Sequence, residues 1–97
     1  MNLQIEYNSA VESINKNIIR VETLISVLTT LYENELSEEE FIIELQMIQL
    51  DLLKHVNKLN DIAMHAMAVN DASLYYRCED KKLEVRDVMD RVRGLYM

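Results

Sequence analysis

The sequence contains no proline, and it has a single glycine, Gly94, and a single cysteine, Cys78. Sheet proteins need turn-forming residues at short intervals, so this shortage argues against strands joined by tight turns. Hydrophobic residues occupy 49% of the 97 positions, which is enough for a packed core and argues against disorder. We therefore expect one all-α domain that spans residues 1–97.

The lone Cys78 excludes an internal disulfide framework and fits a reducing compartment. No histidine lies beside it on its helical row, so we interpret Cys78 as a small buried hydrophobe rather than a nucleophile. The chain shows no secretory signal, in which a basic start precedes an apolar run and a small-residue cleavage site. The apolar run 41–53 is too short to span a bilayer. These features predict a soluble cytoplasmic protein that does not bind membranes.

The formal net charge of −7 is distributed unevenly. Residues 1–35 carry five acidic and two basic side chains, residues 36–70 carry six and two, and residues 71–97 carry six of each. An acidic surface repels phosphate, so nonspecific binding of nucleic acid by the whole surface is disfavoured. Such a surface could attract a basic partner, although keeping the chain soluble is its commoner role.

Apolar residues recur at alternating spacings of four and three, which is the pattern of helices that pack along a seam. The pattern predicts helices over about residues 4–32, 38–69 and 73–93. Short connections imply antiparallel neighbours, so the expected fold is an elongated three-helix bundle with the second helix in the centre. The seam of the second helix is expected to contain Phe41, Leu45, Ile48, Leu52, His55, Leu59, Ile62, Ala66 and Val69.

Local signals support these boundaries. Ser37 and Glu40 have the spacing of a capping box, in which each side chain bonds to the other residue's amide at the start of a helix. The segment 70–73 offers cap-forming residues, and the seam loses its phase after Val69, which favours a break over one continuous helix. Gly94 fits the position just after the last helix.

The segment 41–53 has more apolar residues than one seam requires, since nine of its thirteen residues are apolar. The excess forms a second row on roughly the opposite side of the helix, which needs further cover. We expect this row to meet a second copy of the chain, giving a homodimer through the second helix, or a helix of another protein. The candidate partner-binding residues are Ile43, Met47, Leu50, Leu53, Met64 and Met67.

The third helix carries basic and aromatic residues along one side, a combination that can bind phosphates and stack on bases. The candidate phosphate- or nucleic-acid-binding residues are Tyr75, Lys82, Arg86 and Arg93. The competing interpretation is that their stems cover the core edge and their charges meet the acidic first two helices, within or between subunits. The acidic net charge favours the second interpretation, and the chain has no glycine-rich phosphate loop.

The pairs Asp51/His55 and Asp61/His65 have the i, i+4 spacing that can orient a general base or share a metal. The two histidines lie on different helix faces and no third ligand converges on them, so we expect neither a metal site nor catalysis. His55 occupies a seam position. If its ring is buried in neutral form, acid would charge it and loosen the bundle between about pH 7.5 and about pH 5.5.

The sequence thus predicts a small acidic protein-binding module that is not an enzyme and uses no cofactor. It would act through helix–helix contacts as an adaptor, assembly chaperone, inhibitor or immunity-type protein, by occluding or templating a partner's surface. The alternative is a nucleic-acid or nucleotide binder that uses the basic and aromatic side of the third helix.

Overall fold

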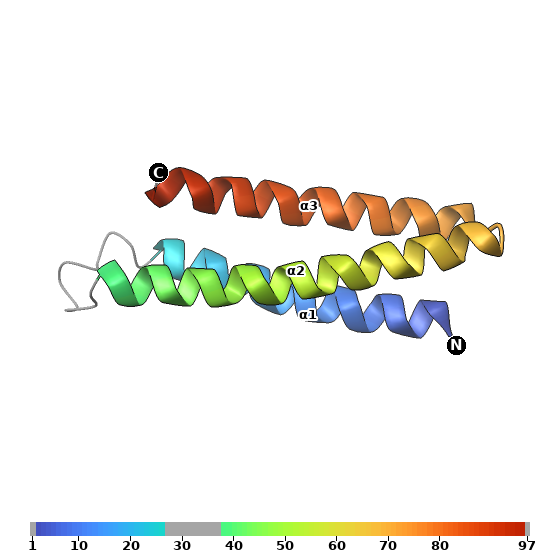
Figure 1. Ribbon diagram of the computed structural model, residues 1–97, viewed down its shortest axis with the longest axis horizontal. Helices are drawn as coiled ribbons and strands as arrows, with labels where there is room; N and C mark the ends of the chain where they lie inside the picture. Colours follow the sequence, from blue (N-terminus) through green and yellow to red (C-terminus); the bar gives the residue numbers. More distant parts are fainter. Residues whose placement is uncertain (1, 27–37, 97) are drawn as a thin grey trace.

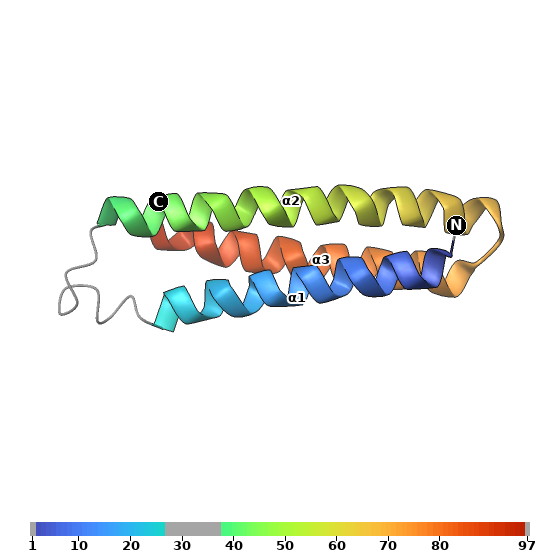
Figure 2. The same ribbon diagram turned by 90° about the horizontal axis from the view of Figure 1, so that it is seen from below.

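The computed structural model describes residues 2–26 and 38–96. These residues form a bundle of three helices in which each helix runs antiparallel to the next along the chain (Figure 1). Helix α1 covers Leu3–Ser26, α2 covers Glu38–Ala68 and α3 covers Ala72–Tyr96, and these described residues contain no strand. The bundle measures 53 × 21 × 16 Å, and α2 packs along both of the other helices (Figure 1, Figure 2). The predicted elongated all-α three-helix bundle is confirmed.

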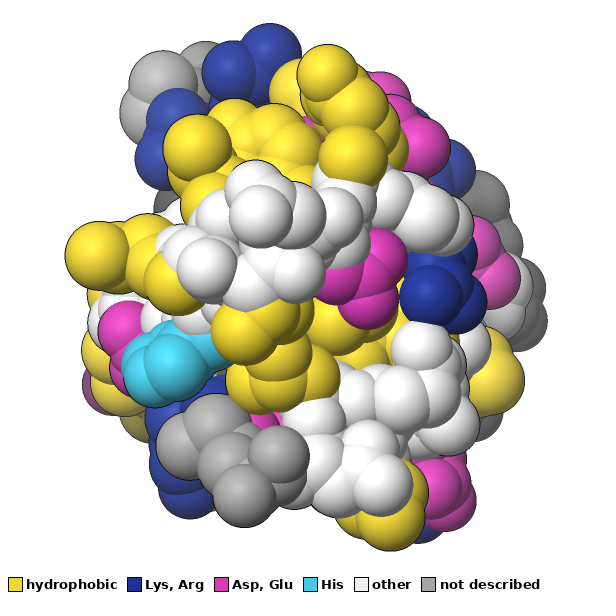
Figure 3. Space-filling view, turned by 90° about the vertical axis from the view of Figure 1, so that its right-hand side faces the viewer, with side chains coloured by type: hydrophobic (Ala, Val, Ile, Leu, Met, Phe, Trp, Pro, Cys, Tyr) yellow, Lys and Arg dark blue, Asp and Glu magenta, His cyan; other side chains and the backbone are white. Residues whose placement is uncertain are grey.

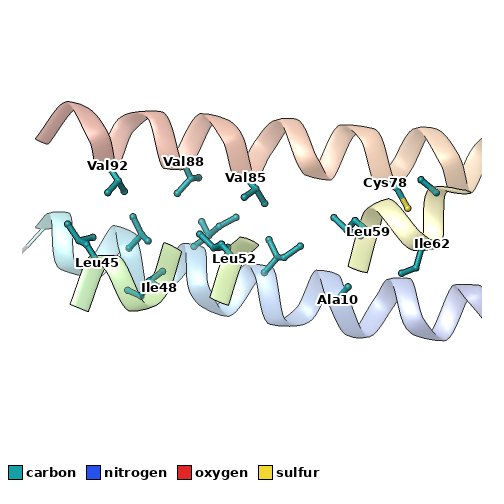
Figure 4. Close-up of a cluster of buried hydrophobic side chains, with 14 of the residues drawn as sticks. Ala10, Leu45, Ile48, Leu52, Leu59, Ile62, Cys78, Val85, Val88 and Val92 are labelled. Carbon is teal, nitrogen blue, oxygen red and sulfur yellow. The ribbon is translucent and has the colours of Figure 1, made fainter. Parts of the chain in front are cut away.

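The core follows the predicted apolar rows. Side chains from α3, such as Val85 and Val92, point toward the α2 residues Leu45 and Leu52 across the bundle axis (Figure 4). The apolar side chains of α1 complete this layer. The largest fully buried side chains are Ile14, Val21, Leu45, Ile48, Leu52, Leu59, Ile62, Leu74, Cys78, Val85 and Val92.

The seam prediction is wrong at Val69, which is 65% exposed. Helix α2 ends one residue earlier, and Asn70 adopts a left-handed conformation with a φ of 59°. The amide of Asn70 donates to the Met67 carbonyl at 3.1 Å, and the amide of Asp71 donates to the Ala66 carbonyl at 2.8 Å. These two bonds form a Schellman motif, which turns the chain away from the helix axis before Val69 can reach the core.

Asp71 also begins the next helix. Its side-chain Oδ1 accepts a hydrogen bond from the Leu74 amide at 3.0 Å, and its backbone carbonyl accepts one from the Tyr75 amide at 3.1 Å. An aspartate in this N-cap position satisfies a backbone donor that the helix itself cannot satisfy. The predicted break at 70–73 is therefore present, and the rival of one continuous helix is excluded.

The predicted end of the third helix is wrong. Gly94 lies inside α3, which continues to Tyr96, and its φ is not positive. A glycine inside a helix costs only about 1 kcal/mol relative to alanine, which does not end a helix held by its core contacts. The expected last turns of the first helix, residues 27–32, and the Ser37 half of the capping box lie outside the described residues.

Replacing Asp71 with alanine removes the acceptor of the Leu74 amide, and we expect the free energy of unfolding to fall by about 1 kcal/mol. In a domain of this size, that change lowers Tm by about 4–8 °C. The matched control is Asp80→Ala, which removes an exposed carboxylate from the interior of α3 without removing a cap. Thermal unfolding followed by circular dichroism measures both variants, and equal Tm values would contradict the capping role.

Candidate protein-binding surface

The outer side of α2 carries the six residues predicted to bind a partner, and all six are exposed. Each is large and apolar, yet each keeps between 50% and 70% of its surface accessible. The cause is geometric, because α1 and α3 pack on one side of α2 and a helical row half a turn away points outward. The residues are Ile43, Met47, Leu50, Leu53, Met64 and Met67.

These residues form two groups rather than one continuous surface. Met64 follows Leu53 by eleven positions, which is about 16 Å along a helix. Polar residues, including Lys54 and Asp61, occupy the outer side between them. The first group, termed the α2 patch below, consists of Ile43, Met47, Leu50 and Leu53.

Met67 belongs to the end of the bundle, where α2 turns into α3. A cavity of about 280 Å³ there is lined by Met67, Tyr75, Tyr76 and residues of the turn. Figure 3 shows hydrophobic side chains on this end of the molecule, where Val69 and Tyr76 are 65% and 63% exposed. The four–three spacing predicts Val69 in the core, so its exposure could not be expected from the pattern. The exposure of Tyr76 could have been expected, because this residue lies off the apolar row that contains Leu74.

A groove of about 440 Å³ runs between α2 and α3 beside the α2 patch, and is termed the α2/α3 groove below. Leu53 belongs to both, so the exposed apolar surface continues from the patch into the groove. The other apolar residues of the lining are Val56, Leu83, Val85 and Met89. The charged residues of the lining, all from α3, are Glu79, Lys82, Arg86, Asp90 and Arg93.

The three cations of the α2/α3 groove are compensated to different degrees. The Lys82 ammonium lies 2.6 Å from a Glu79 carboxylate oxygen and donates to the side-chain carbonyl of Asn60 at 2.8 Å. Arg93 lies 3.8 Å from Asp90, and both side chains are mostly exposed. Among residues 2–26 and 38–96, no side chain forms an ion pair or hydrogen bond with Arg86.

The structure brings together three of the four residues of the alternative phosphate site. Lys82, Arg86 and Arg93 line one groove, whereas Tyr75 lines the end cavity and meets the ring of Tyr76 edge-on, with 5.3 Å between centroids. Two of these three cations already have carboxylate neighbours. Proteins that bind nucleic acids tightly typically make about six to ten phosphate contacts, so this cluster is small for that purpose.

On its other side, α2 is connected to α1 by polar contacts. Asn17 is 4% exposed, and its amide donates to the Ser13 carbonyl at 3.0 Å and to the Asp51 carboxylate. The same carboxylate oxygen lies 3.5 Å from Nε2 of His55. This cluster provides the buried Asn17 amide with partners from both helices, so its polar side chain is satisfied inside the bundle.

Of the two predicted carboxylate–histidine pairs, Asp51/His55 is present and Asp61/His65 is not. Nδ1 of His65 lies 2.8 Å from the backbone carbonyl of Asp61, not from its carboxylate. The side chain of His55 is 20% exposed, and its Nε2 faces the Asp51 carboxylate. The premise that the His55 ring is buried is therefore wrong. In the described part of the chain, no three histidine, cysteine or carboxylate side chains converge as metal ligands.

Two titratable groups near the contact of α1 with α3 have raised pKa values. Burial raises the pKa of Tyr7, and the Arg77 guanidinium, 5.3 Å from the ring centroid, partly offsets this effect. Burial likewise raises the pKa of Cys78, with a smaller opposite contribution from Lys82. A raised pKa keeps the enclosed Cys78 in its thiol form, which is a poor nucleophile.

The chain matches no protein-family model, no curated protein and no solved structure. Within the residues that the structure describes, none of the helices has an apolar stretch long enough to cross a membrane. The candidate site is therefore described from its own side chains. It consists of an exposed apolar row on α2 beside a groove whose charged lining residues all belong to α3.

The raised pKa of Cys78 makes stability depend on pH. The neutral thiol is favoured by folding, so its stabilisation is complete below the ordinary pKa of 9.0 and is lost as the pH rises through the higher folded value. We expect the free energy of unfolding to fall as the pH rises above the ordinary thiol pKa of 9.0, and to fall less steeply in Cys78→Val. Urea denaturation at each pH measures both slopes. Parallel slopes would contradict the assignment.

Proposed function

We propose that this protein is a small, acidic, non-enzymatic protein-binding module that acts through helix–helix contacts on the outer side of α2. The α2 patch carries the proposal, because its large apolar side chains are exposed while Phe41, Leu45, Ile48 and Leu52 of the same stretch are buried. A module of this kind could serve as an adaptor, assembly chaperone, inhibitor or immunity-type protein, by covering or templating a partner's surface.

Burial of the α2 patch would supply most of the affinity. Transferring a leucine, isoleucine or methionine side chain fully out of water stabilises by about 1.5–3 kcal/mol, and each residue of the patch retains at least half of its surface for this purpose. A few such residues at the centre of an interface typically contribute most of its binding free energy. Met47 adds an adaptable contact, because its flexible thioether chain fits different surfaces.

The geometry of the patch suits a helical partner. Ile43, Met47 and Leu50 follow one another at spacings of four and three, which is the spacing that seats the ridge of a second helix. The partner is another protein or a second copy of the chain, in which case two α2 patches would meet about a twofold axis.

The proposal involves no chemical step on a substrate. Cys78 is enclosed in the core with a raised pKa, and the Asp51 carboxylate bonds to the buried Asn17 amide. These groups therefore stabilise the bundle, while the surface beside them offers apolar contact area.

A photoreactive benzoylphenylalanine at Ile43 tests the proposal in cells that produce the protein. We expect covalent adducts from this position, because it would lie inside the interface. The same residue at Ile19, which is 61% exposed on α1, is the matched control and should give few adducts. Mass spectrometry of the adducts distinguishes a second copy from another protein.

The double substitution of Met47 and Leu50 by glutamate should abolish the adducts from Ile43, because it places two charges in the apolar contact. Helix content should stay the same, since substitutions at exposed positions usually change stability by less than about 0.5 kcal/mol. The control pair is Ile5→Glu with Ile19→Glu on α1. Equal labelling from Ile19, or adducts that survive the double substitution in α2, would contradict the proposal.

A further inference from the structure

Two helical rows with the four–three spacing of packed helices contribute residues to the α2/α3 groove. Leu53 and Val56 of α2 and Lys82, Arg86 and Arg93 of α3 line it directly. The α2 row has no charged residue and consists of Ile42, Gln46, Gln49, Leu53, Val56 and Asn60. The α3 row consists of Tyr75, Glu79, Lys82, Arg86, Met89 and Arg93.

The charges of α2 are segregated to the side away from this groove. Glu44 pairs with Arg20 of α1, and Lys58 lies 3.2 Å from Glu6 of α1. All five aspartate, glutamate and lysine residues of α2 after Glu40 either bond to α1 or line the cavity between α1 and α2. They are Glu44, Asp51, Lys54, Lys58 and Asp61. The electrostatic character of the groove is therefore set by α3 alone.

Within the groove, α3 presents a positive charge that residues 2–26 and 38–96 do not neutralise. Glu79 compensates Lys82 at 2.6 Å, and Asp90 lies at a longer 3.8 Å from Arg93. Arg86 lies between them along the helix and has no ion-pair or hydrogen-bond partner among the described residues. The protein as a whole has a net charge of −7, so this groove is a local exception to its acidic surface.

We propose that the α2/α3 groove binds an amphipathic helix of another protein, whose apolar seam packs between the two rows and whose flanking carboxylates meet Arg86 and Arg93. The proposal rests on the proposed function, since it names the chemistry of the partner that reaches the α2 patch through Leu53. Arg86 and Arg93 are seven positions apart, about 10.5 Å along α3. The partner's carboxylates are therefore also seven positions apart.

Carboxylates are the complementary groups for two reasons. A carboxylate beside Arg86 would form a charge-assisted hydrogen bond, and Arg can hold it with two parallel N–H donors. The apolar walls of Leu53, Val56 and Leu83 reduce solvent screening, which strengthens the interaction relative to an exposed pair. A basic helix would be attracted by the overall negative charge, but in this groove it would face an uncompensated cation.

A second copy of the chain is a poorer occupant. Helix α1 has only two large apolar residues exposed on its described length, Ile5 and Ile19, so it lacks a continuous apolar seam. The outer row of α2 does have such a seam in the α2 patch, and Glu44 and Asp51 flank it seven positions apart. Both carboxylates are already engaged with α1, however, since Glu44 pairs with Arg20 and Asp51 accepts a hydrogen bond from the buried Asn17 amide.

The test is a display library of synthetic helices of about three heptads, with a fixed leucine seam and with glutamate, glutamine or lysine at each flanking position. Selection on the wild-type protein should enrich glutamate at two flanking positions seven apart. Selection on Arg86→Glu should enrich lysine instead, and the wild-type binders should bind this variant about tenfold or more weakly. The matched control is Arg91→Glu, the same charge change on the α1 side of α3, where Arg91 lies 3.8 Å from Glu22. It should leave affinity and selection unchanged.

Each other outcome overturns the inference. Binders without a charge preference that are lost in Leu50→Glu would contradict the acidic partner but keep the proposed function. No enriched helix, together with no adducts from Ile43, would end both. A dimer of the protein that dissociates in Arg86→Glu would assign the groove to a second copy. Binding of a labelled single-stranded oligonucleotide that Arg86→Glu abolishes would assign it to nucleic acid, and circular dichroism confirms that each variant is folded.

Discussion

The bundle depends on α2 supplying apolar side chains to two neighbouring helices at once. Leu45, Ile48 and Leu52 are fully buried in the resulting core, and loss of such a side chain to alanine typically costs about 2–5 kcal/mol. The residues of one four–three row cover only part of the helix circumference, so the neighbours leave the opposite side uncovered. The buried core and the exposed α2 patch are thus consequences of the same helix geometry, and only the patch remains available to another molecule.

Apolar rows allow two helices to slide past one another by a heptad, and polar contacts oppose such a shift. The buried Asn17 amide meets Asp51 only when α1 and α2 have their observed alignment. Lys81 does the same for α3, because its stem lies at the edge of the core while its ammonium reaches Asn15 of α1. Lys82 bonds to Asn60 of α2 at 2.8 Å. These contacts explain how long, repetitive helices adopt one alignment.

The sequence predicts the helices well because a buried four–three row reports directly on packing, and the loss of phase after Val69 indicates the break between α2 and α3. It fails at Val69 and Gly94 for a different reason. Both positions lie near a helix end, where the local backbone geometry decides which residue is the last of the helix. Helix α2 ends where it does because Asn70 is left-handed and the amides of Asn70 and Asp71 both bond to carbonyls of the last turn. Helix ends are therefore harder to predict than helix cores, since few residues determine each of them.

The exposed row of α2 and the basic row of α3 could both be recognised in the sequence. The sequence did not show that the two rows meet at one groove. A four–three seam has two flanks, and the sequence does not say which flank of α2 faces α3. The charges carry that information in retrospect, because Glu44, Asp51 and Lys58 all lie on the flank that meets Arg20, Asn17 and Glu6 of α1. The uncharged flank then has to face α3. Because α2 directs its charged flank toward α1, all the charged residues that line the groove between α2 and α3 belong to α3.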